Sequence, residues 1–398
     1  MKYGLLVEKE TRNIGDDIQA YAAKKFLPQI DYYVDRNHID EFLPDREEFV
    51  ATILNGWFLQ YTLNWPMSPF IKPLPISMHF TNKDWFWDTT DRAYHLLGYG
   101  LESLKRIEPI GCRDSHTKKL LEEKGIETFY SGCLTLTLDK YEDVEKQDYI
   151  CAVDVSKNVI EKIKKSTKLE VKEITHTVPE NYYELSWEER FKNVENLLRT
   201  YQGAKAVVSY RLHCALPCIA LETPVILLNE DYRNDRFGDY TKYINSCSEE
   251  DFVEGKVNFD FENLAKAAEE WRKLRENIEK RCNTFIKECE NNKEKYNGVS
   301  IKDYKEYSIN RSNWLKEATR ESYERFETEK KKNDGIKEEM NKTISDLEKL
   351  CSNNEEKANY YKKEFENAVE KLEKYKEENE RIKNSRLWKL RNKIKGIN

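Results

Sequence analysis

The sequence lacks any apolar run long enough to cross a membrane, since no stretch approaches the roughly 20 apolar residues of a spanning helix. Its first ten residues, MKYGLLVEKE, have no long apolar segment after the lysine, and we therefore expect no signal peptide. Together these two absences predict a cytoplasmic protein.

The sequence also lacks the residue spacings of metal sites and disulfide frameworks. Its nine cysteines include no Cys-x-x-Cys pair, and there is no tight cluster of His, Cys and Asp and no Asp-x-Asp. An odd number of scattered cysteines indicates reduced thiols, as in cytosolic proteins. Cys214 and Cys218 are one helical turn apart, a spacing that favours packing over metal ligation. We therefore expect metal-independent chemistry with no cofactor.

An excess of positive charge is missing as well. The net charge of −6 argues against a general nucleic-acid binder, because such binding needs a dominant basic face. Charged residues make up 35% of the 398 residues, whereas roughly a quarter is usual. Part of the chain is therefore not expected to build a globular core.

Short apolar strands alternate with helical patterns through the first part of the chain, which predicts an α/β fold with parallel sheets. A polar stretch, DKYEDVEKQD, divides the strands into two sets, so we expect two Rossmann-like domains facing each other across a cleft. The expected strands are 3–7, 30–34, 50–54, 76–80, 107–112 and 127–130, then 149–153, 169–176, 204–210 and 225–228. The expected helices are 18–26, 93–105, 114–124, 158–165, 187–201 and 214–221.

Beyond about residue 255 the composition changes to Glu, Lys and Asn, with helical spacing throughout. From Met340 to Ile382 apolar positions recur in alternating steps of four and three, which is typical of a coiled-coil seam. The seam implies a homo-oligomer, most simply a parallel dimer or trimer, although an intramolecular hairpin and a single solvated helix stay open. The full seam is Met340, Ile344, Leu347, Cys351, Asn354, Ala358, Tyr361, Phe365, Ala368, Leu372, Tyr375, Asn379 and Ile382.

The last residues, SRLWKLRNKIKGIN, have no acidic side chain. Their apolar and basic residues alternate as in an amphipathic helix that lies on an anionic membrane surface. The alternative is a charged helix end, where lysines are favourable near the C-terminal dipole. The first interpretation predicts peripheral contact with the inner face of the cell membrane.

The stretch SYRLHCALPCIALETPVILL (209–228) places Arg211 and His213 at the junction between an expected strand and an expected helix. The N–H groups at a helix N-terminus favour an anion, and a guanidinium matches carboxylate or phosphate oxygens. A histidine can exchange protons near neutral pH. The pair suits a small anion that must be protonated. The alternative is an arginine paired with a buried acid and a histidine satisfied in the core.

The first expected domain offers comparable junctions. In TRNIGDDIQAY, Asp16 is expected to cap the helix, while Asp17 and Gln19 are candidates for contact with a sugar hydroxyl, as Asp16 is too. Asn55-Gly56 ends another strand, where a glycine lets a backbone approach a ligand. His79 stands near the end of a further strand and is a candidate for substrate binding, although a lone histidine there is more often structural.

The stretch PIGCRDSHTKKLL puts Arg113 at the N-terminus of a helix capped by Asp114 or Ser115, and Asp114 is also a candidate for substrate binding. A cation is unfavourable at the positive end of a helix, so its presence there invites an anionic partner. With Arg211, it would clamp a small polyanion.

The motifs GDDIQ, NGWF, ISMHF, GCRDSHTKKLLEEKGI, SGCLTLTL and SYRLHCALPCIALETPVILL, in this order, resemble the bacterial polysaccharide pyruvyl transferase family over roughly residues 1–245. The resemblance implies a two-domain, GT-B-like fold. It also implies transfer of a pyruvyl group from phosphoenolpyruvate to sugar hydroxyls of a surface-polysaccharide precursor, giving a pyruvate ketal. The family's Arg-Leu-His motif, here Arg211 and His213, is implicated in donor binding and catalysis, and Arg113 matches through GCRD alone. Within SGCLTLTL, Ser131 and Gly132 are further candidates for substrate binding.

The expected domains are an acceptor-side domain, a donor-side domain, a helical extension, a coiled coil and a basic tail, at residues 1–140, 141–255, 256–335, 336–384 and 385–398. Phosphoenolpyruvate and a glycan acceptor, either free or lipid-linked, are the expected partners, with His213 as general acid and Arg211 and Arg113 holding the donor. Two alternatives stay open. One is a GT-B-type glycosyltransferase with a nucleotide-sugar donor, and the other is a non-catalytic binding module.

Overall fold

The computed structural model describes residues 1–58, 64–80, 96, 98–229, 234–292, 301–352 and 358–385. The chain divides into two compact units. The first comprises Met1–Phe80 and Gly98–Ile309, and the second comprises Thr81–Leu97 and Asn310–Asn398. None of the helices in the described ranges is both long and apolar enough to cross a membrane.

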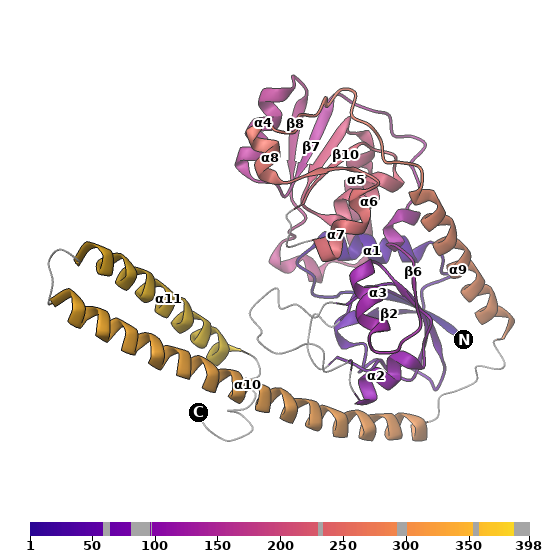
Figure 1. Ribbon diagram of the computed structural model, residues 1–398. Coiled ribbons are helices and arrows are strands. Elements are labelled where there is room, and N and C mark those ends of the chain that lie inside the picture. The colour runs from indigo at the N-terminus through magenta and orange to yellow at the C-terminus, as the bar shows by residue number, and fades with distance from the viewer. Residues whose placement is uncertain are drawn as a thin grey trace. The chain divides into compact units, whose positions relative to one another are not determined.

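The first unit contains two separate parallel sheets (Figure 1). The first sheet has the strand order β2-β1-β3-β4-β5-β6, and each neighbouring pair is parallel. β1 and β3 are buried along almost their whole length, as expected for parallel strands covered on both faces. The strands are β1 (Lys2–Val7), β2 (Tyr32–Asp35), β3 (Val50–Trp57), β4 (Ile71–His79), β5 (Ile110–Cys112) and β6 (Thr128–Tyr130). All six were predicted.

β4 begins at Ile71, five residues before the start of the predicted strand. The prediction missed its first half because Pro73 and Pro75 are atypical of a strand. Both prolines lie opposite residues of β3. Among the described residues, β5 pairs with β4 only at Met78, so the first half of β4 has an open side. Proline is tolerated there because its missing N–H removes no ladder hydrogen bond.

The second sheet has the order β11-β10-β9-β7-β8 and is also parallel throughout. Its strands are β7 (Tyr149–Val153), β8 (Glu170–Ile174), β9 (Ala206–Ser209), β10 (Val225–Leu228) and β11 (Asn245–Cys247). Four of them were predicted. The edge strand β11 was missed because its sequence, NSC, is half-buried and carries no apolar run. The two parallel sheets confirm the α/β fold class.

The helices of the first unit are α1 (Ile14–Lys24), α2 (Gly98–Lys105), α3 (Ser115–Glu122), α4 (Lys157–Ser166), α5 (Trp187–Gly203), α6 (Leu212–Ala220), α7 (Asn234–Thr241), α8 (Glu249–Glu254) and α9 (Trp271–Asn291). The 3-10 turns are η1 (Arg36–His38), η3 (Leu134–Thr137) and η4 (Glu180–Glu184). The prediction that Asp16 caps α1 is wrong, because the side chain of Asn13 accepts the hydrogen bond from the Gly15 N–H. The cap of α3 is Asp114, one of the two residues predicted for it.

The core of the first unit lies around α1, which packs against α5, α6 and η3 (Figure 1). α9 packs against η3, β3 and β4, and it buries Trp271, Ile278 and Cys282. Its sequence is strongly charged, yet apolar residues recur at every third or fourth position, and all of them except the partly buried Leu274 are buried. α9 is therefore part of the core around the two sheets.

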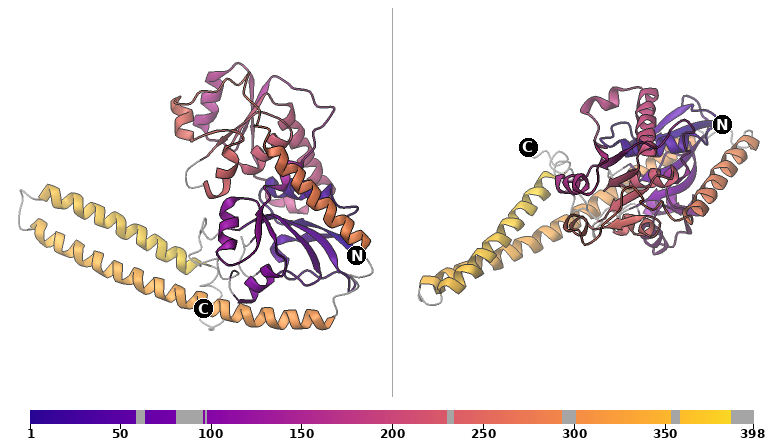
Figure 2. Two further views of the ribbon diagram at one scale, coloured as in Figure 1. Left: turned by 45° about the vertical axis from the view of Figure 1, so that its right-hand side comes forward. Right: turned by 90° about the horizontal axis from the view of Figure 1, so that it is seen from above.

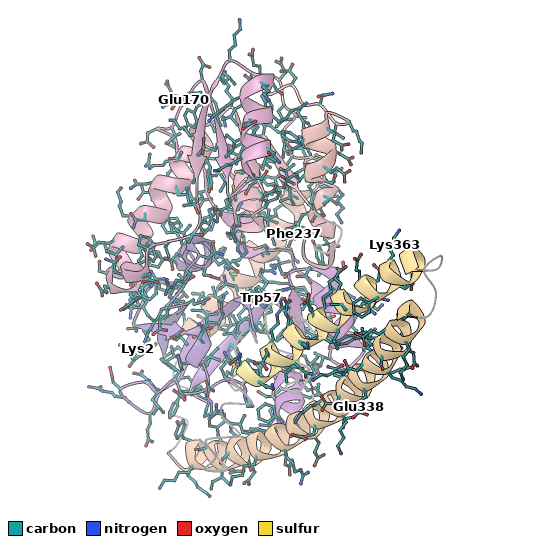
Figure 3. The ribbon with its side chains drawn as sticks, turned by 90° about the vertical axis from the view of Figure 1, so that its left-hand side faces the viewer. Lys2, Trp57, Glu170, Phe237, Glu338 and Lys363 are labelled. Atoms are coloured by element: carbon teal, nitrogen blue, oxygen red, sulfur yellow. The ribbon has the colours of Figure 1, made fainter. Side chains whose placement is uncertain are left out.

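The carboxyl ends of the strands point toward the middle of the first unit. Figure 3 shows Lys2, the first residue of β1, and Glu170, the first residue of β8, at opposite ends of the unit. Trp57, the last residue of β3, projects between them. Ligands of parallel α/β folds bind beyond the carboxyl ends of the strands, so this middle region is where a site is expected.

The second unit contains a pair of long helices. α10 (Ile301–Ser352) begins in the first unit and continues into the second, and α11 (Ala358–Asn384) runs back beside it (Figures 1 and 2). Leu372 and Ile382, two positions of the predicted seam, are buried. The seam is thus carried by two antiparallel helices, and the coiled coil predicted over 336–384 is not confirmed. The basic residues of the predicted tail, from Arg386 onward, lie outside the described residues.

Candidate functional site

An ion pair between Asp17 and Arg190 joins the two sheet domains. Arg190, on α5, donates to Asp17 on α1 through Nε at 2.9 Å and Nη2 at 2.6 Å. Tyr182 donates a third hydrogen bond to the same carboxylate at 2.9 Å. Both members of the pair are essentially unexposed. Asp17 is therefore fully occupied by protein groups, and the structure does not present it to a ligand.

The N-terminus of α1 is also tied to the second sheet domain through the backbone. Asn13 forms an antiparallel bridge with Thr177, and the Ile14 N–H donates to the carbonyl of His176 at 2.9 Å. We call residues 12–17 and 176–190 the interdomain joint. Its hydrogen bonds and the Arg190 ion pair hold the first turn of α1 in a fixed position relative to the second sheet.

The joint brings α1 against the Arg-Leu-His motif. A Cβ atom built on Gly15 would lie only 3.2 Å from the Cβ of His213, so the glycine allows the close approach of the two helices. His213 is the second residue of α6, and the residue is 9% exposed. The motif predicted from the second domain and the GDDIQ motif from the first thus meet at two helix N-termini.

Asp16 lies beside this contact in a network of polar side chains. Its carboxylate accepts from Thr11 Oγ1 at 2.8 Å, from Gln19 Nε2 at 3.3 Å and from Arg36 Nη1 at 3.3 Å. Its side chain is 17% exposed, and Arg36 is buried and also paired with Glu8. Burial raises the pKa of Asp16 to about 6, although the hydrogen bond from Thr11 acts in the opposite direction. This carboxyl group therefore changes its charge close to neutral pH.

Asn55 and Gly56, at the end of β3, support the same network. The Asn55 side chain donates to the carbonyl of Gln19 at 3.1 Å. Gly56 has a φ of +129°, and a Cβ atom added to it would lie 2.9 Å from Nη1 of Arg36. The glycine is needed for its backbone conformation and for the space that the arginine occupies.

His79 and Asp114 form a buried pair on the α3 side of the first sheet. The Nδ1 atom of His79 is 2.6 Å from Oδ2 of Asp114, and Thr117 donates its N–H to the other carboxylate oxygen at 2.8 Å. Burial alone would raise the pKa of Asp114, but the facing His79 and the nearby Arg113 hold it well below its usual range. Both side chains are unexposed, and each is a polar partner of the other in this structure.

Arg113 stands out because its guanidinium is fully buried and poorly paired. Its Nε atom is 3.6 Å from Asp114, beyond hydrogen-bond distance, and none of its three nitrogens has a hydrogen-bond partner in the part of the chain that the structure describes. The backbone of Arg113 is held firmly, since its N–H donates to Met78 and its carbonyl accepts from Tyr240 at 2.6 Å. A buried cation without hydrogen bonds costs several kcal/mol, so a guanidinium in this setting is suited to an anionic partner.

Arg211 is the N-cap residue of α6 and is paired with Asp154. Its Nε atom donates to Asp154 Oδ2 at 2.7 Å, yet its side chain is 41% exposed. Asp154 follows β7 and also accepts from Thr175 and from the His176 N–H. The pair is thus half open to solvent, and it sets the direction of Arg211 through one nitrogen of the guanidinium.

Ser131 and Gly132 take part in the turn between β6 and η3. The Ser131 hydroxyl donates to the carbonyl of Cys112 at 3.0 Å and accepts from the Ser77 N–H at 3.1 Å. Gly132 has a φ of +74°, and a Cβ atom on it would crowd Leu274 of α9. In this structure both residues shape the backbone that leads into η3.

The predicted residues therefore fall into three groups. Asp16, Gln19, Gly56 and His213 come together where α1 meets α6, and the charge of Arg113 acts on Asp16 from the end of β5. A second group already contacts neighbouring protein groups. It consists of Asp17, His79, Asp114 and Ser131, the amide nitrogen of Asn55, and Gly132, which packs against Leu274. Arg211 lies at the exposed edge of its ion pair.

Sequence reasoning missed Arg190 and Arg36. Arg190 occupies the buried face of α5 together with Phe191, Val194 and Leu198, and a charge in that apolar register was the available signal. Arg36 follows β2 in a polar segment without any comparable pattern. Within the described ranges, no group of three or more His, Cys, Asp and Glu side chains is placed to hold a metal ion. Turnover without a metal stays a prediction.

A family model described as polysaccharide pyruvyl transferase matches residues 13–232, more than half of the chain. No curated protein matches the chain by sequence. Among solved structures, the UDP-GlcNAc 2-epimerase of Methanocaldococcus jannaschii, in complex with UDP-GlcNAc and UDP, is similar with a TM-score of 0.37 and 12% identity, covering 70% of this chain and 98% of that one. A variant of the wall teichoic acid polymerase TagF is similar with a TM-score of 0.33 and 9% identity, covering 80% of this chain and 90% of that one.

Proposed function

This chain belongs to the polysaccharide pyruvyl transferase family, and from that membership we propose that it transfers the pyruvyl group of phosphoenolpyruvate to sugar hydroxyls of a surface-polysaccharide precursor. The product is a pyruvate ketal. The observation that carries the choice of donor is the buried guanidinium of Arg113, which has no hydrogen-bond partner in the described ranges. Such a group needs an anion, and phosphoenolpyruvate supplies a carboxylate and a phosphate.

The donor is proposed to bind where the first turns of α1 and α6 meet. Arg113 holds one anionic group, and the N–H groups at the start of α6 together with Arg211 hold the other. The ion pair with Asp154 leaves Arg211 partly exposed, which supports such a role. Because Arg113 is fully covered in this structure, the donor reaches it only when neighbouring side chains move.

His213 is proposed as the group that protonates the donor. As the first sugar hydroxyl forms a bond to the central carbon of phosphoenolpyruvate, the methylene carbon takes a proton and becomes a methyl group. Attack by the second hydroxyl then breaks the bond between the central carbon and the phosphate oxygen, and phosphate leaves. Arg113 stabilises the charge on the departing phosphate, and removing one such donor group typically costs about 10²–10³-fold in rate.

A donor screen with the full-length protein tests this proposal. We expect phosphoenolpyruvate to raise the melting temperature, and phosphate to be released when a galactose- or mannosamine-type acceptor is added. Stabilisation by a nucleotide sugar but not by phosphoenolpyruvate would instead identify a glycosyltransferase. If neither donor binds, and if a His213→Ala variant retains the function of the wild-type protein in cells, the non-catalytic alternative is supported.

Two further proposals concern the parts beyond the sheets. The basic tail is proposed to hold the enzyme near an anionic membrane, close to a lipid-linked acceptor. Sedimentation with vesicles tests this, because binding to anionic vesicles should fall with salt while neutral vesicles bind little. Equal binding to both vesicle types would contradict it. Cytoplasmic localisation, which the sequence predicts, is proposed as well.

A further inference from the structure

The proposed reaction, on which the following inference rests, moves protons at two different places. A proton must reach the methylene carbon of the donor, and each attacking sugar hydroxyl must lose one. The imidazole of His213 is assigned to the methylene carbon of the donor. In that position it is not also placed to accept the proton from the hydroxyl of the acceptor sugar. A second group that exchanges protons near neutral pH is therefore required.

Asp16 and Asp17 are adjacent in sequence but differ in what they can do. Asp17 is unexposed and accepts three hydrogen bonds from Arg190 and Tyr182. Asp16 has different partners, Thr11, Gln19 and Arg36, and its side chain keeps 17% of its surface exposed. Neighbouring carboxyl groups in different environments commonly take different roles in a reaction. Only Asp16 of this pair is accessible to a substrate.

The position of Asp16 places it at the proposed reaction centre. The preceding residue, Gly15, packs directly against His213, and the interdomain joint fixes this contact. The guanidinium of Arg113 is close enough to act on the charge of Asp16. Asp16 is thus next in sequence to the residue that contacts His213, within electrostatic reach of Arg113, and on the domain opposite His213.

Charged groups face Asp16 from each element packed around it. Arg36, from η1, is 3.3 Å away and shares its charge with Glu8 of the loop after β1. Asp17 disfavours a second negative charge, whereas Arg113 and Arg190 favour it. His213 approaches from α6. Burial is the largest influence and raises the pKa of Asp16 to about 6, which suits a group that accepts and releases protons.

We propose that Asp16 is a catalytic residue that accepts the proton of the attacking sugar hydroxyl, with Gln19 and Arg36 as positioning residues that orient its carboxylate. The hydroxyl O–H bond breaks as its oxygen bonds to the central carbon of the donor, and the proton moves to a carboxylate oxygen of Asp16. His213 gives one proton to the methylene carbon in the same step. Asp16 passes this proton to solvent, and it then accepts the proton of the second hydroxyl as that oxygen displaces the phosphate.

The test compares Asp16→Asn with wild type in two assays, donor binding by thermal shift and phosphate release across pH. Asparagine keeps the size of the side chain but cannot accept the proton. We expect phosphoenolpyruvate to stabilise the variant as it stabilises wild type, while kcat falls by about 10²–10⁴-fold. In wild type the rate should fall below about pH 6, and this acidic limb should be absent from the residual activity of the variant.

Asp31→Asn is the matched control, because Asp31 is a carboxylate paired with Lys2 at the far end of β1 and should keep the full rate. Arg36→Gln provides a second test, in which Asp16 itself is unchanged. Removal of the nearby positive charge should shift the acidic limb of the rate to higher pH.

The outcomes separate this inference from the proposed function. If wild type uses phosphoenolpyruvate but Asp16→Asn retains kcat within about threefold and the same acidic limb, Asp16 is not the proton acceptor. An Asp16→Asn variant that raises KM alone would make it a binding residue and overturn the inference too. A wild-type protein that releases no phosphate with any acceptor contradicts the proposed function itself. If Asp16→Asn does not fold, an acidic limb that is unmoved in Arg36→Gln overturns the inference.

Discussion

Arg190 and Asp17 form a bidentate ion pair, at 2.9 and 2.6 Å, that links α5 of the second sheet domain to α1 of the first. Arg190 also donates to the backbone carbonyls of Glu8 and Lys9, both at 2.9 Å, and its guanidinium lies 4.0 Å from the Trp187 ring. One side chain thus ties together the loop after β1, the first turn of α1 and the start of α5.

The first prediction concerns this pair. Arg190→Met should lower the free energy of unfolding by about 3–5 kcal/mol, because it leaves the buried carboxylate of Asp17 without its counter-charge. Urea unfolding of the full chain measures the change. Arg199→Met is the matched control, since Arg199 is partly exposed in its pairs with Asp143 and Glu195 and should cost about 1 kcal/mol or less. Equal losses in the two variants would contradict the central role of the pair.

The second prediction separates binding from stability at Arg113. Arg113→Gln should abolish the stabilisation by phosphoenolpyruvate while leaving the melting temperature of the ligand-free protein unchanged or higher. The reason is that the substitution removes a buried charge that has no hydrogen-bond partner in the described ranges. Thermal shift with and without the donor measures both effects. A large fall in the ligand-free melting temperature would show that Arg113 serves the fold instead.

The third prediction follows from the charge of Asp16. Its folded-state pKa of about 6 lies above the usual 3.8, so the folded protein prefers the protonated form. This preference favours folding at low pH and is lost as the pH rises from about 4 to about 6, which corresponds to roughly 3 kcal/mol at most. Asp16→Asn should therefore be more stable than wild type at neutral pH, with the difference vanishing at the acidic end of that range. Unfolding curves at several pH values measure it, and a difference that does not depend on pH would contradict the assignment.

The fourth prediction tests the space beside Arg36. Gly56→Ala should destabilise the first unit by about 1–3 kcal/mol, because the residue has a φ of +129° and its new Cβ would lie 2.9 Å from Nη1 of Arg36. Gly335→Ala is the control. Nothing lies within 4 Å of a Cβ on Gly335 in α10, and a helical alanine should add about 0.5–1 kcal/mol of stability. Circular dichroism during thermal unfolding follows both variants, and the opposite signs are the result that matters.

The fifth prediction concerns the long helices. Leu372 and Ile382 are buried in a single chain whose α11 runs back beside α10, and we therefore predict the intramolecular hairpin that the sequence left open. Leu372→Asp should lower the helix content, whereas Lys371→Asp, at an exposed position beside it, should not. The helix melting temperature should be independent of protein concentration. A melting temperature that rises with concentration would instead indicate the homo-oligomer that the seam predicted.

Much of the fold could be predicted because parallel strands covered on both faces are continuous apolar runs. β1, β3, β7, β9 and β10 all have that pattern, and each was predicted. The first half of β4 and the edge strand β11 were not, because prolines and polar residues are tolerated where a strand has an open side. The described positions of the heptad spacing from Met340 to Ile382 lie on two helices, α10 and α11. Spacing alone does not say whether the apolar face of a helix packs against another chain or against a second helix of the same chain.

The amino-acid sequence by itself determined the two sheets, the helix that starts near Asp16, and the positions of Arg113, Arg211 and His213 at junctions between strands and helices. Only the tertiary structure decided which charges are paired. Arg190 is 173 residues from Asp17 along the chain, yet it occupies that carboxylate and leaves its neighbour Asp16 partly exposed. Local patterns set strands and helices through hydrogen bonding and periodic burial, whereas the partner of a buried charge depends on how distant elements pack.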